Sequence, residues 1–246
     1  MLINQTQQKL QTLGLSGMAR AFEQLFQRPE SQNISFEDCV GLLADAEVCD
    51  RDNRRIARFL KSAKLRHGRA TLADIDYQPS RKLNQPLIMS LSDCGWIDRR
   101  QNLILTGATG TGKSWMACAF GLQACRNGFS VYYTTATQLY EDLAHAQADG
   151  SLPKLRRLLI KTRLLILDDL GIGGVDTALG PVLLDIIDQQ TLQGALLITS
   201  QYPTSKWYDL FNDPTVADAI LDRIVHRSHS LQLQGESMRK LKANEL

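Results

Sequence analysis

One stretch of eight residues constrains this chain more than any other. Residues 107–114 have the sequence G-A-T-G-T-G-K-S, which matches the phosphate-binding P-loop pattern G-x-x-x-x-G-K-[ST]. The apolar run before it, 102–106, is typical of a buried strand, and residues 115–127 after it favour a helix. Glycines let the loop turn its backbone N–H groups toward phosphates, and the helix N-terminus attracts the same negative charge. The pattern therefore predicts a nucleotide site.

Side-chain chemistry suggests roles within this loop. Lys113 can reach the β- and γ-phosphates, and the hydroxyl of Ser114 suits Mg²⁺. The alternative, a glycine-rich turn that binds nothing, does not account for the strand before the loop and the helix after it. The expected nucleotide contacts are Gly107, Ala108, Thr109, Gly110, Thr111, Gly112, Lys113, Ser114 and Trp115.

Composition places the chain among ordinary globular proteins. Its 246 residues suit one large domain or a medium domain with a smaller appendage, and 43% apolar residues are enough for a core. Five scattered cysteines without a C-x-x-C pair argue against a disulfide framework and a zinc site. The chain shows neither a signal-peptide pattern nor a run of about eighteen apolar residues. We therefore expect a cytoplasmic protein without a membrane segment.

The chain is expected to divide near residues 70 to 100. Before this point, apolar side chains over 15–26 repeat at helical spacing, and Ser35 followed by Asp38 resembles a capping box. This pattern predicts a helical N-terminal domain over 1–70, and its basic segment, residues 51–69, is the reason to expect DNA binding or oligomerisation there. A connector over 71–100 and an ATPase domain over 101–246 complete the predicted organisation.

Residues 51–69 concentrate positive charge. They contain eight Lys or Arg and a single acid, Asp52. On a helix that ends near Gly68, the apolar residues within 56–63 form one stripe and the basic side chains lie opposite. A helix face that is merely solvated normally mixes signs, so this face favours a phosphate backbone. The candidate DNA contacts are Arg51, Arg54, Arg55, Arg58, Lys61, Lys64, Arg66 and Arg69.

From residue 102 onward, strand and helix patterns alternate, which indicates an α/β fold with a parallel sheet. The predicted strands are 102–106, 130–134, 164–168, 195–200 and 230–234. The predicted helices between them lie around 115–127, 137–148, 177–192 and 214–227.

A buried strand pattern delivers two carboxylates to one strand end, in the sequence R-L-L-I-L-D-D-L-G at 163–171. Ligands bind at the carboxyl edge of open α/β sheets. We therefore expect Asp168 to hold Mg²⁺ opposite Ser114, and Asp169 to orient or activate the attacking water. The alternative is that both aspartates cap the next turn.

The strand predicted at 195–200 ends in hydroxyls and an amide. In a parallel sheet it can lie beside the strand that carries Asp168, so that Thr199, Ser200 or Gln201 approaches the γ-phosphate or the attacking water. Gln201 has the longest reach and both a donor and an acceptor. A polar exit from the strand is the alternative.

Arg223 follows a helical run with apolar residues on its packed face. A guanidinium there can project across a subunit boundary onto a neighbour's nucleotide, as an arginine finger that stabilises charge in phosphoryl transfer. Local ion pairing with Asp222 and His226 is equally compatible with the spacing.

Together these segments resemble the IstB family of AAA+ ATPases, helper proteins of insertion sequences that also encode a transposase, IstA. The likeness covers nearly the whole chain and rests on G-A-T-G-T-G-K-S, L-L-I-L-D-D-L-G, I-T-S-Q-Y-P, A-D-A-I-L-D-R-I-V-H and G-E-S-M-R-K. It implies an AAA+ P-loop fold, a central parallel sheet flanked by helices with a small all-α N-terminal domain. ATP and Mg²⁺ are the implied cofactors.

The resemblance also implies roles for individual residues. Asp168 and Asp169 occupy the metal and hydrolysis positions, Gln201 lies near the sensor-1 position, and Arg223 matches the arginine finger. Arg239 resembles a sensor-2 arginine that contacts the nucleotide. Only 16 residues follow Ser230, so we expect a truncated lid.

The family resemblance implies a mechanism in which ATP at subunit interfaces favours a homo-oligomer on duplex DNA. The assembly then recruits or activates the transposase, and hydrolysis resets it. A DnaC-like replicative helicase loader, with single-stranded DNA as its ligand, shares the same ATPase core and is the nearest alternative. A DNA-binding module that uses ATP only as a structural ligand and a small-molecule P-loop kinase are further alternatives.

Overall fold

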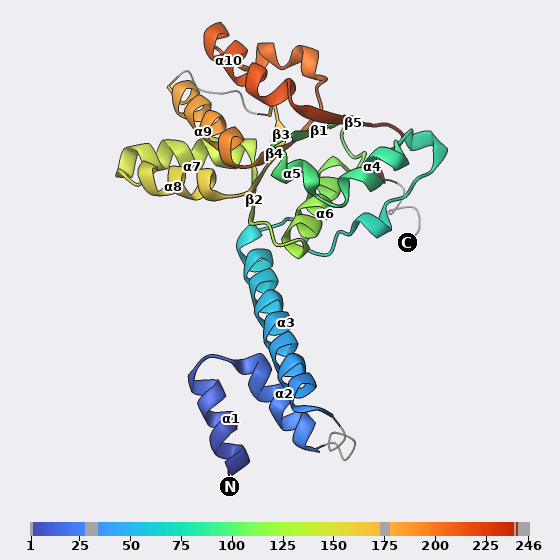
Figure 1. Ribbon diagram of the computed structural model, residues 1–246. Coiled ribbons are helices and arrows are strands. Elements are labelled where there is room, and N and C mark those ends of the chain that lie inside the picture. Colours follow the sequence, from blue (N-terminus) through green and yellow to red (C-terminus); the bar gives the residue numbers. More distant parts are fainter. Residues whose placement is uncertain (1, 28–33, 173–177, 239, 241–246) are drawn as a thin grey trace. The chain divides into compact units, whose positions relative to one another are not determined.

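A computed structural model describes residues 2–27, 34–172, 178–238 and 240 (Figure 1). The chain forms two compact units, Met1–Arg58 and Phe59–Leu246. The N-terminal domain predicted from the sequence extends to residue 70. In the structure, residues 59–70 belong to the unit that contains the sheet.

The first unit is helical, with α1 (Leu2–Thr12), α2 (Ser16–Gln27) and most of α3 (Phe36–Ala63). Helix α2 begins against α3 at Gly17, where an added Cβ would lie 2.4 Å from the carbonyl oxygen of Ala46. The carboxylate of Glu47 accepts hydrogen bonds from the backbone N–H groups of Gly17 (2.8 Å) and Met18 (3.2 Å). A side chain from α3 therefore caps the first turn of α2, where backbone donors have no helical partner.

The second unit contains a five-stranded sheet in the order β2-β3-β4-β1-β5, and every neighbouring pair is parallel (Figure 1). The strands are β1 (Asn102–Gly107), β2 (Val131–Thr135), β3 (Leu164–Leu170), β4 (Ala195–Ser200) and β5 (Ser228–Leu233). The predicted parallel α/β sheet is confirmed. Its fifth strand lies slightly earlier in the chain than expected.

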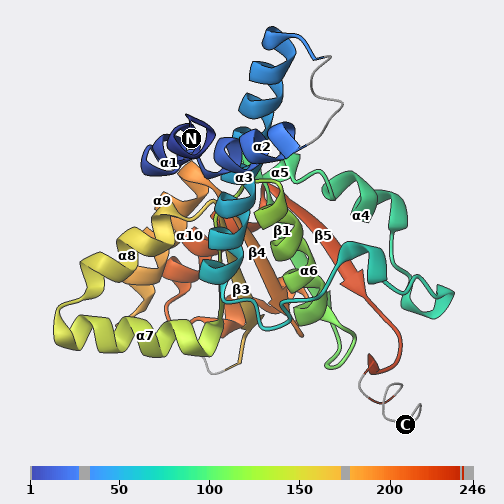
Figure 2. The same ribbon diagram turned by 90° about the horizontal axis from the view of Figure 1, so that it is seen from below.

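Helices cover both faces of the sheet (Figure 2). The longer helices are α6 (Lys113–Arg126), α7 (Ala136–Asp149), α8 (Leu152–Lys161), α9 (Gly180–Gln193) and α10 (Pro214–Val225). Short helices α4 (Gln85–Leu91) and α5 (Gly95–Asp98) precede β1, and single turns lie at Leu72–Asp74, Pro79–Arg81, Thr204–Lys206 and Tyr208–Leu210.

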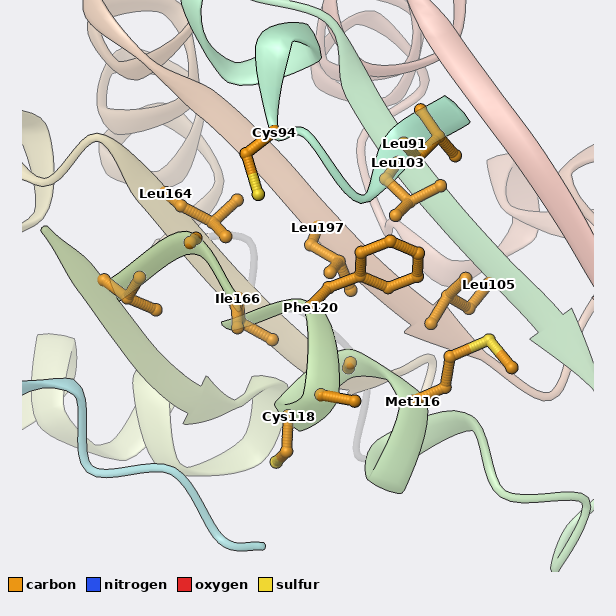
Figure 3. Packing of buried hydrophobic residues seen from close by; sticks show 14 of the residues in the cluster. Leu91, Cys94, Leu103, Leu105, Met116, Cys118, Phe120, Leu164, Ile166 and Leu197 are labelled. Atoms are coloured by element: carbon orange, nitrogen blue, oxygen red, sulfur yellow. The ribbon is translucent and has the colours of Figure 1, made fainter. Parts of the chain in front are cut away.

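Alternating side chains of each strand enter two separate apolar clusters, as the two-residue period of a strand requires. In β1, Leu103 and Leu105 face α6, whereas Ile104 faces the cluster of α7, α9 and α10. Figure 3 shows Phe120 of α6 among Leu103, Leu105 and Leu197. Its ring is fully buried, which stabilises the fold by about 2–3 kcal/mol. This packing holds α6, and with it the loop that precedes α6, against the sheet.

The prediction that the basic helix continues to near Gly68 is wrong. Helix α3 ends at Ala63, and Lys64 adopts a left-handed conformation with φ +54°. The next residue, Leu65, packs on the core, and it lies so close to Gly121 of α6 that a Cβ there would come within 2.9 Å. Burial of Leu65 therefore turns the chain out of the helix, and Arg66 and Arg69 lie on a turn beyond it.

Glu47 gives the first unit a defined pH dependence. A hydrogen bond from Arg51 lowers the pKa of Glu47 below its usual value of 4.5, and the N–H groups of Gly17 and Met18 act in the same direction while burial opposes them. A lowered folded-state pKa means that the stabilisation is complete above pH 4.5 and is lost as the pH falls through the folded-state pKa. We expect hydrogen-exchange protection of the Gly17 and Met18 amides to fall in that acid range.

The matched variants are Glu47→Gln and Glu37→Gln, which neutralise a buried and an exposed carboxylate of the same helix. Hydrogen exchange on the full chain should show the acid-dependent loss in the wild type and in Glu37→Gln, but not in Glu47→Gln. The same pH profile in all three proteins would refute the cap.

Candidate nucleotide-binding site

The predicted P-loop connects the carboxyl end of β1 to the first turn of α6. Gly107 and Gly110 have φ values of +150° and +89°, which side-chain-bearing residues rarely adopt. An added Cβ would lie 2.2 Å from the carbonyl oxygen of Leu233 at Gly107, and 2.3 Å from Oγ of Ser237 at Gly110. Both glycines are therefore required by backbone conformation and by close approach of the C-terminal segment.

Lys113 lies inside the loop, and only 6% of its surface is exposed. Its Nζ donates to the carbonyl oxygens of Gly107 (2.8 Å) and Ala108 (3.0 Å). A phosphate that enters the loop can accept from the same ammonium group, and charge-assisted hydrogen bonds of this kind are among the stronger ones. Thr111 also donates from its Oγ1 to the carbonyl oxygen of Ala108 (2.8 Å), which holds the loop closed on itself.

Ser114 lies half-buried in the first turn of α6. The next residue, Trp115, packs against the apolar cluster on the α6 face. The side chain of Trp115 therefore contributes to the core, which leaves its backbone N–H as the group that suits a phosphate.

The carboxylate of Asp168 is fully buried at the end of β3. Its Oδ2 accepts a hydrogen bond from the hydroxyl of Tyr133 on β2, and its Oδ1 accepts one from Thr199 on β4, both at 2.6 Å. Burial, reinforced by the negative charge of Asp168, raises the pKa of Tyr133 above its usual value, so that the phenol stays protonated. Sequence reasoning did not find Tyr133.

Asp169 follows in a left-handed conformation with φ +60°. The β3–β4 register shifts here, from Leu167 opposite Ile198 to Leu170 opposite Ser200, which leaves one extra residue in β3. The N–H of Asp169 donates to Oγ1 of Thr199 (2.9 Å). Thr199 therefore holds the carboxylate of Asp168 and the backbone of Asp169 through one hydroxyl.

The residues at the end of β4 have separate partners. Thr199, rather than Gln201, contacts Asp168 and Asp169. Gln201 instead accepts from Oγ1 of Thr109 in the P-loop (3.2 Å), and it is exposed. β4 lies between β1 and β3. Its carboxyl end therefore lies between the P-loop after β1 and the Asp168–Asp169 end of β3, as the parallel arrangement predicted.

Arg223 lies near the end of α10 with 35% of its side chain exposed. Its Nε pairs with Asp188 of α9 (2.5 Å) and its Nη1 donates to the carbonyl of Ala219 (2.8 Å). The alternative that Asp222 and His226 hold Arg223 is wrong, because these two residues pair with each other at 3.1 Å. Helical spacing alone does not reveal Asp188, which comes from another helix.

A second cation lies beside the P-loop and was not found from the sequence. Arg81 is 8% exposed, and its guanidinium donates to two backbone carbonyl oxygens, from Nη2 to that of Thr111 (2.9 Å) and from Nη1 to that of Asp76 (2.7 Å). The C-terminal segment also contacts the P-loop, because the N–H of Met238 donates to the carbonyl of Gly110 (2.9 Å). Arg239, the expected sensor-2 residue, lies outside the described residues.

Comparison with known proteins places this arrangement in a family. The model of the IstB-like ATP binding protein family matches residues 8–245. An insertion sequence ATP-binding protein of Sinorhizobium fredii, y4pL, is 43% identical over 240 residues, which cover 98% of each chain. This chain belongs to the IstB-like ATP-binding protein family. The resemblance found in the sequence is therefore confirmed.

Solved structures agree on the fold of this IstB-like protein. AMPPCP-bound DnaA from Aquifex aeolicus has a TM-score of 0.58 and 18% identity, with 72% of this chain and 55% of that chain covered. The DnaC helicase loader has a TM-score of 0.55 and 17% identity, with 69% of this chain and 99% of that chain covered. These likenesses show the AAA+ P-loop ATPase fold.

A membrane-spanning helix needs a long apolar stretch, and the helices of the described residues contain none of sufficient length and apolarity.

The donors of the IstB-like site fit the groups that its family binds. The glycine cradle and Lys113 suit a triphosphate. The described residues contain no cluster of three or more His, Cys, Asp or Glu able to hold a metal by itself. Mg²⁺ on a nucleotide needs only one or two protein oxygens besides the phosphates, and Ser114 and Asp168 offer a hydroxyl and a carboxylate.

The basic face predicted on α3 is partly neutralised within the IstB-like chain. Arg51 pairs with Glu47 (2.8 Å), Arg54 pairs with Glu47 (3.3 Å) and Asp50 (2.7 Å), and Arg55 pairs with Asp52 (3.1 Å). Glu47 and Asp50 lie just before residue 51, outside the segment whose charges indicated the basic face. On the helix they are one or two turns from the arginines with which they pair. The i,i+4 spacing of Glu47 and Arg51 was a usable signal.

The contact at Gly110 gives a direct test of the loop geometry. Gly110→Ala places a Cβ in a left-handed conformation and against Ser237, so we expect ATP affinity to fall at least tenfold. Gly150→Ala is the matched control, since its φ of +79° imposes the same strain in open space. Calorimetric titration with ATP and thermal melting separate the two effects. Unchanged ATP affinity in Gly110→Ala would contradict the described cradle.

Proposed function

We propose that this chain is a Mg²⁺-dependent ATPase that assembles on duplex DNA and assists the transposase of an insertion sequence. The observation that carries the proposal is the meeting of the P-loop and the Asp168–Asp169 end of β3 at one sheet edge, in an IstB-like chain. Relatives of this chain are named insertion sequence ATP-binding proteins, and this association with insertion sequences supports a transposase as the partner.

The chemistry assigned to the site follows from its donors. Lys113 and the loop N–H groups bind the β- and γ-phosphates, and Ser114 and Asp168 hold Mg²⁺, which neutralises charge on the phosphates. Asp169 orients the attacking water, and Gln201, already bonded to Thr109, approaches the γ-phosphate from β4.

We assign Arg223 to a neighbouring copy's nucleotide. A triphosphate carries more charge than the single carboxylate of Asp188, and Arg223 is exposed enough to exchange one for the other. ATP promotes assembly only if it binds the assembled state more tightly. A guanidinium supplied across the subunit boundary provides that difference, so a homo-oligomer with ATP at its interfaces follows from the assignment.

DNA binding is assigned to the basic residues of α3 and the turn after it. An open hollow of about 600 Å³ in the first unit is lined by Arg51, Arg54, Arg55, Arg58, Asp52 and Gly14. Among the described residues, Arg58 has no carboxylate partner, whereas the other arginines of the hollow are shared with acids. Phosphates therefore meet least competition at Arg58, and repetition over several copies strengthens individually weak contacts.

A DnaC-like helicase loader remains the second candidate, and one observation favours it. Phe26 and Phe36 of the first unit are 58% and 82% exposed, and exposed aromatic rings stack on single-stranded bases. Competition between duplex and single strands of equal length separates the two functions. Preference for the single strand would replace the duplex proposal.

Hydrolysis and the shared site are tested by multiple-turnover phosphate release with duplex DNA. We expect Lys113→Ala to lose ATP binding and Arg223→Ala to keep ATP binding but lose turnover. Asp188→Asn, which breaks the same ion pair and keeps the guanidinium, should retain turnover. Mixing the Lys113→Ala and Arg223→Ala proteins should restore part of the activity, because each supplies what the other lacks.

Two outcomes would contradict this assignment. Normal turnover in Arg223→Ala excludes a finger role, and equal losses in Arg223→Ala and Asp188→Asn assign the ion pair a structural role only. ATP binding without any turnover in the wild type would favour a module that uses ATP as a structural ligand.

DNA contact is tested by charge reversal. Arg55→Glu combined with Arg58→Glu removes two phosphate contacts and should reduce the slope of log Kd against log salt by about two. Lys9→Glu combined with Arg126→Glu changes the net charge equally at other exposed positions and should preserve the slope. Equal slopes in both double variants would refute the assigned face.

A further inference from the structure

Two adjacent tyrosines on β2 have opposite surroundings. Tyr132 and Tyr133 are each 8% exposed, and they belong to the separate apolar clusters on the two faces of the sheet. Tyr133 pairs with Ile166 in the β2–β3 register, and Thr135 pairs with Asp168. Tyr133 therefore shares a face with Asp168, whereas Tyr132 faces away from it.

The hydrogen bond from Tyr133 to Asp168 is short and buried, at 2.6 Å from the hydroxyl to Oδ2. Hydroxyl-to-carboxylate bonds of this length are among the stronger hydrogen bonds in proteins. Thr199 supplies the matching donor to Oδ1. Because both of these donors are neutral, neither cancels the charge of Asp168, and each oxygen keeps one further lone pair for another ligand.

We propose that Tyr133 is a positioning residue of the Mg²⁺ site, which holds the carboxylate of Asp168 in the orientation that receives the metal bound with ATP. The proposal rests on the proposed function for the metal and the nucleotide. It adds a residue from β2, a strand that carries none of the P-loop or strand-end acidic motifs.

The physical argument is pre-organisation. A carboxylate held at both oxygens loses its rotational freedom during folding, so metal binding does not have to order it. Outer partners of metal ligands commonly affect metal affinity tenfold or more when removed. Without Tyr133, Asp168 keeps a donor on Oδ1 alone and can rotate away from the metal.

The variant Tyr133→Phe removes one hydroxyl and keeps the packed ring, and Tyr132→Phe is the matched control. The measurement is binding of ATP to the full chain, first in EDTA and then over a Mg²⁺ titration. We expect Tyr133→Phe to keep the metal-free affinity and to need about tenfold more Mg²⁺ for half-maximal effect, whereas Tyr132→Phe matches the wild type. Binding of Mn²⁺, followed by electron paramagnetic resonance in the presence of ATP, should show the same order.

A double-mutant cycle isolates the route through Asp168. In an Asp168→Asn background, Tyr133→Phe should add nothing to the Mg²⁺ requirement. This comparison also keeps the proposal testable if Tyr133→Phe lowers stability, because thermal melting reports that loss separately.

Two results would overturn the proposal. One is a Mg²⁺ requirement of Tyr133→Phe equal to that of the wild type, and the other is a joint fall of the metal-free affinity and the melting temperature with no separate metal effect. A wild-type protein that binds no ATP overturns the proposed function as well, so failure of Tyr133 alone is distinguishable from failure of the whole site.

Discussion

The buried carboxylate of Asp168 is the group on which the rest of the site depends. A fully buried charge is tolerated only when hydrogen bonds replace the lost water, and here β2 and β4 each supply a hydroxyl to it. These bonds require β3 to lie between β2 and β4. The same order places β4 between β3 and β1, so the P-loop reaches the same edge of the sheet. The strand order therefore places the buried carboxylate and the phosphate-binding loop at one edge of the sheet.

The cations of the proposed mechanism lie at two different edges of the sheet. Lys113 and Arg81 are at the P-loop, where each donates to backbone carbonyl oxygens. Arg223 lies at the opposite edge, since its carbonyl oxygen accepts from the side chain of Asn102, the first residue of β1. It pairs with Asp188, a carboxylate that is itself 39% exposed. Ion pairs this exposed contribute only about 1 kcal/mol, so replacing Asp188 by a phosphate costs little.

The N-terminal unit uses charge differently. Glu47 is buried by the turn that starts α2, and it orders Arg51 and Arg54 on the same helix that carries the remaining basic residues. The acids reduce the net positive charge of the face, but they fix the direction of flexible side chains before any ligand arrives. For the proposed contact with a phosphate backbone, this pre-organisation would lower the entropy lost on binding. The uncompensated charge is concentrated at Arg58 and beyond.

The sequence by itself determined the P-loop, the strand that ends in Asp168 and Asp169, and the parallel α/β class, because these depend on local patterns of glycine, apolar residues and strand length. Tertiary structure alone decided the partners: Tyr133 and Thr199 on Asp168, Asp188 on Arg223, and Arg81 at the P-loop. It also ended α3 at Ala63, since burial of Leu65 against Gly121 outweighs the preference of the basic segment for a longer helix. Such contacts join residues that are distant in the chain, and their energies come from burial and register, which no local spacing contains.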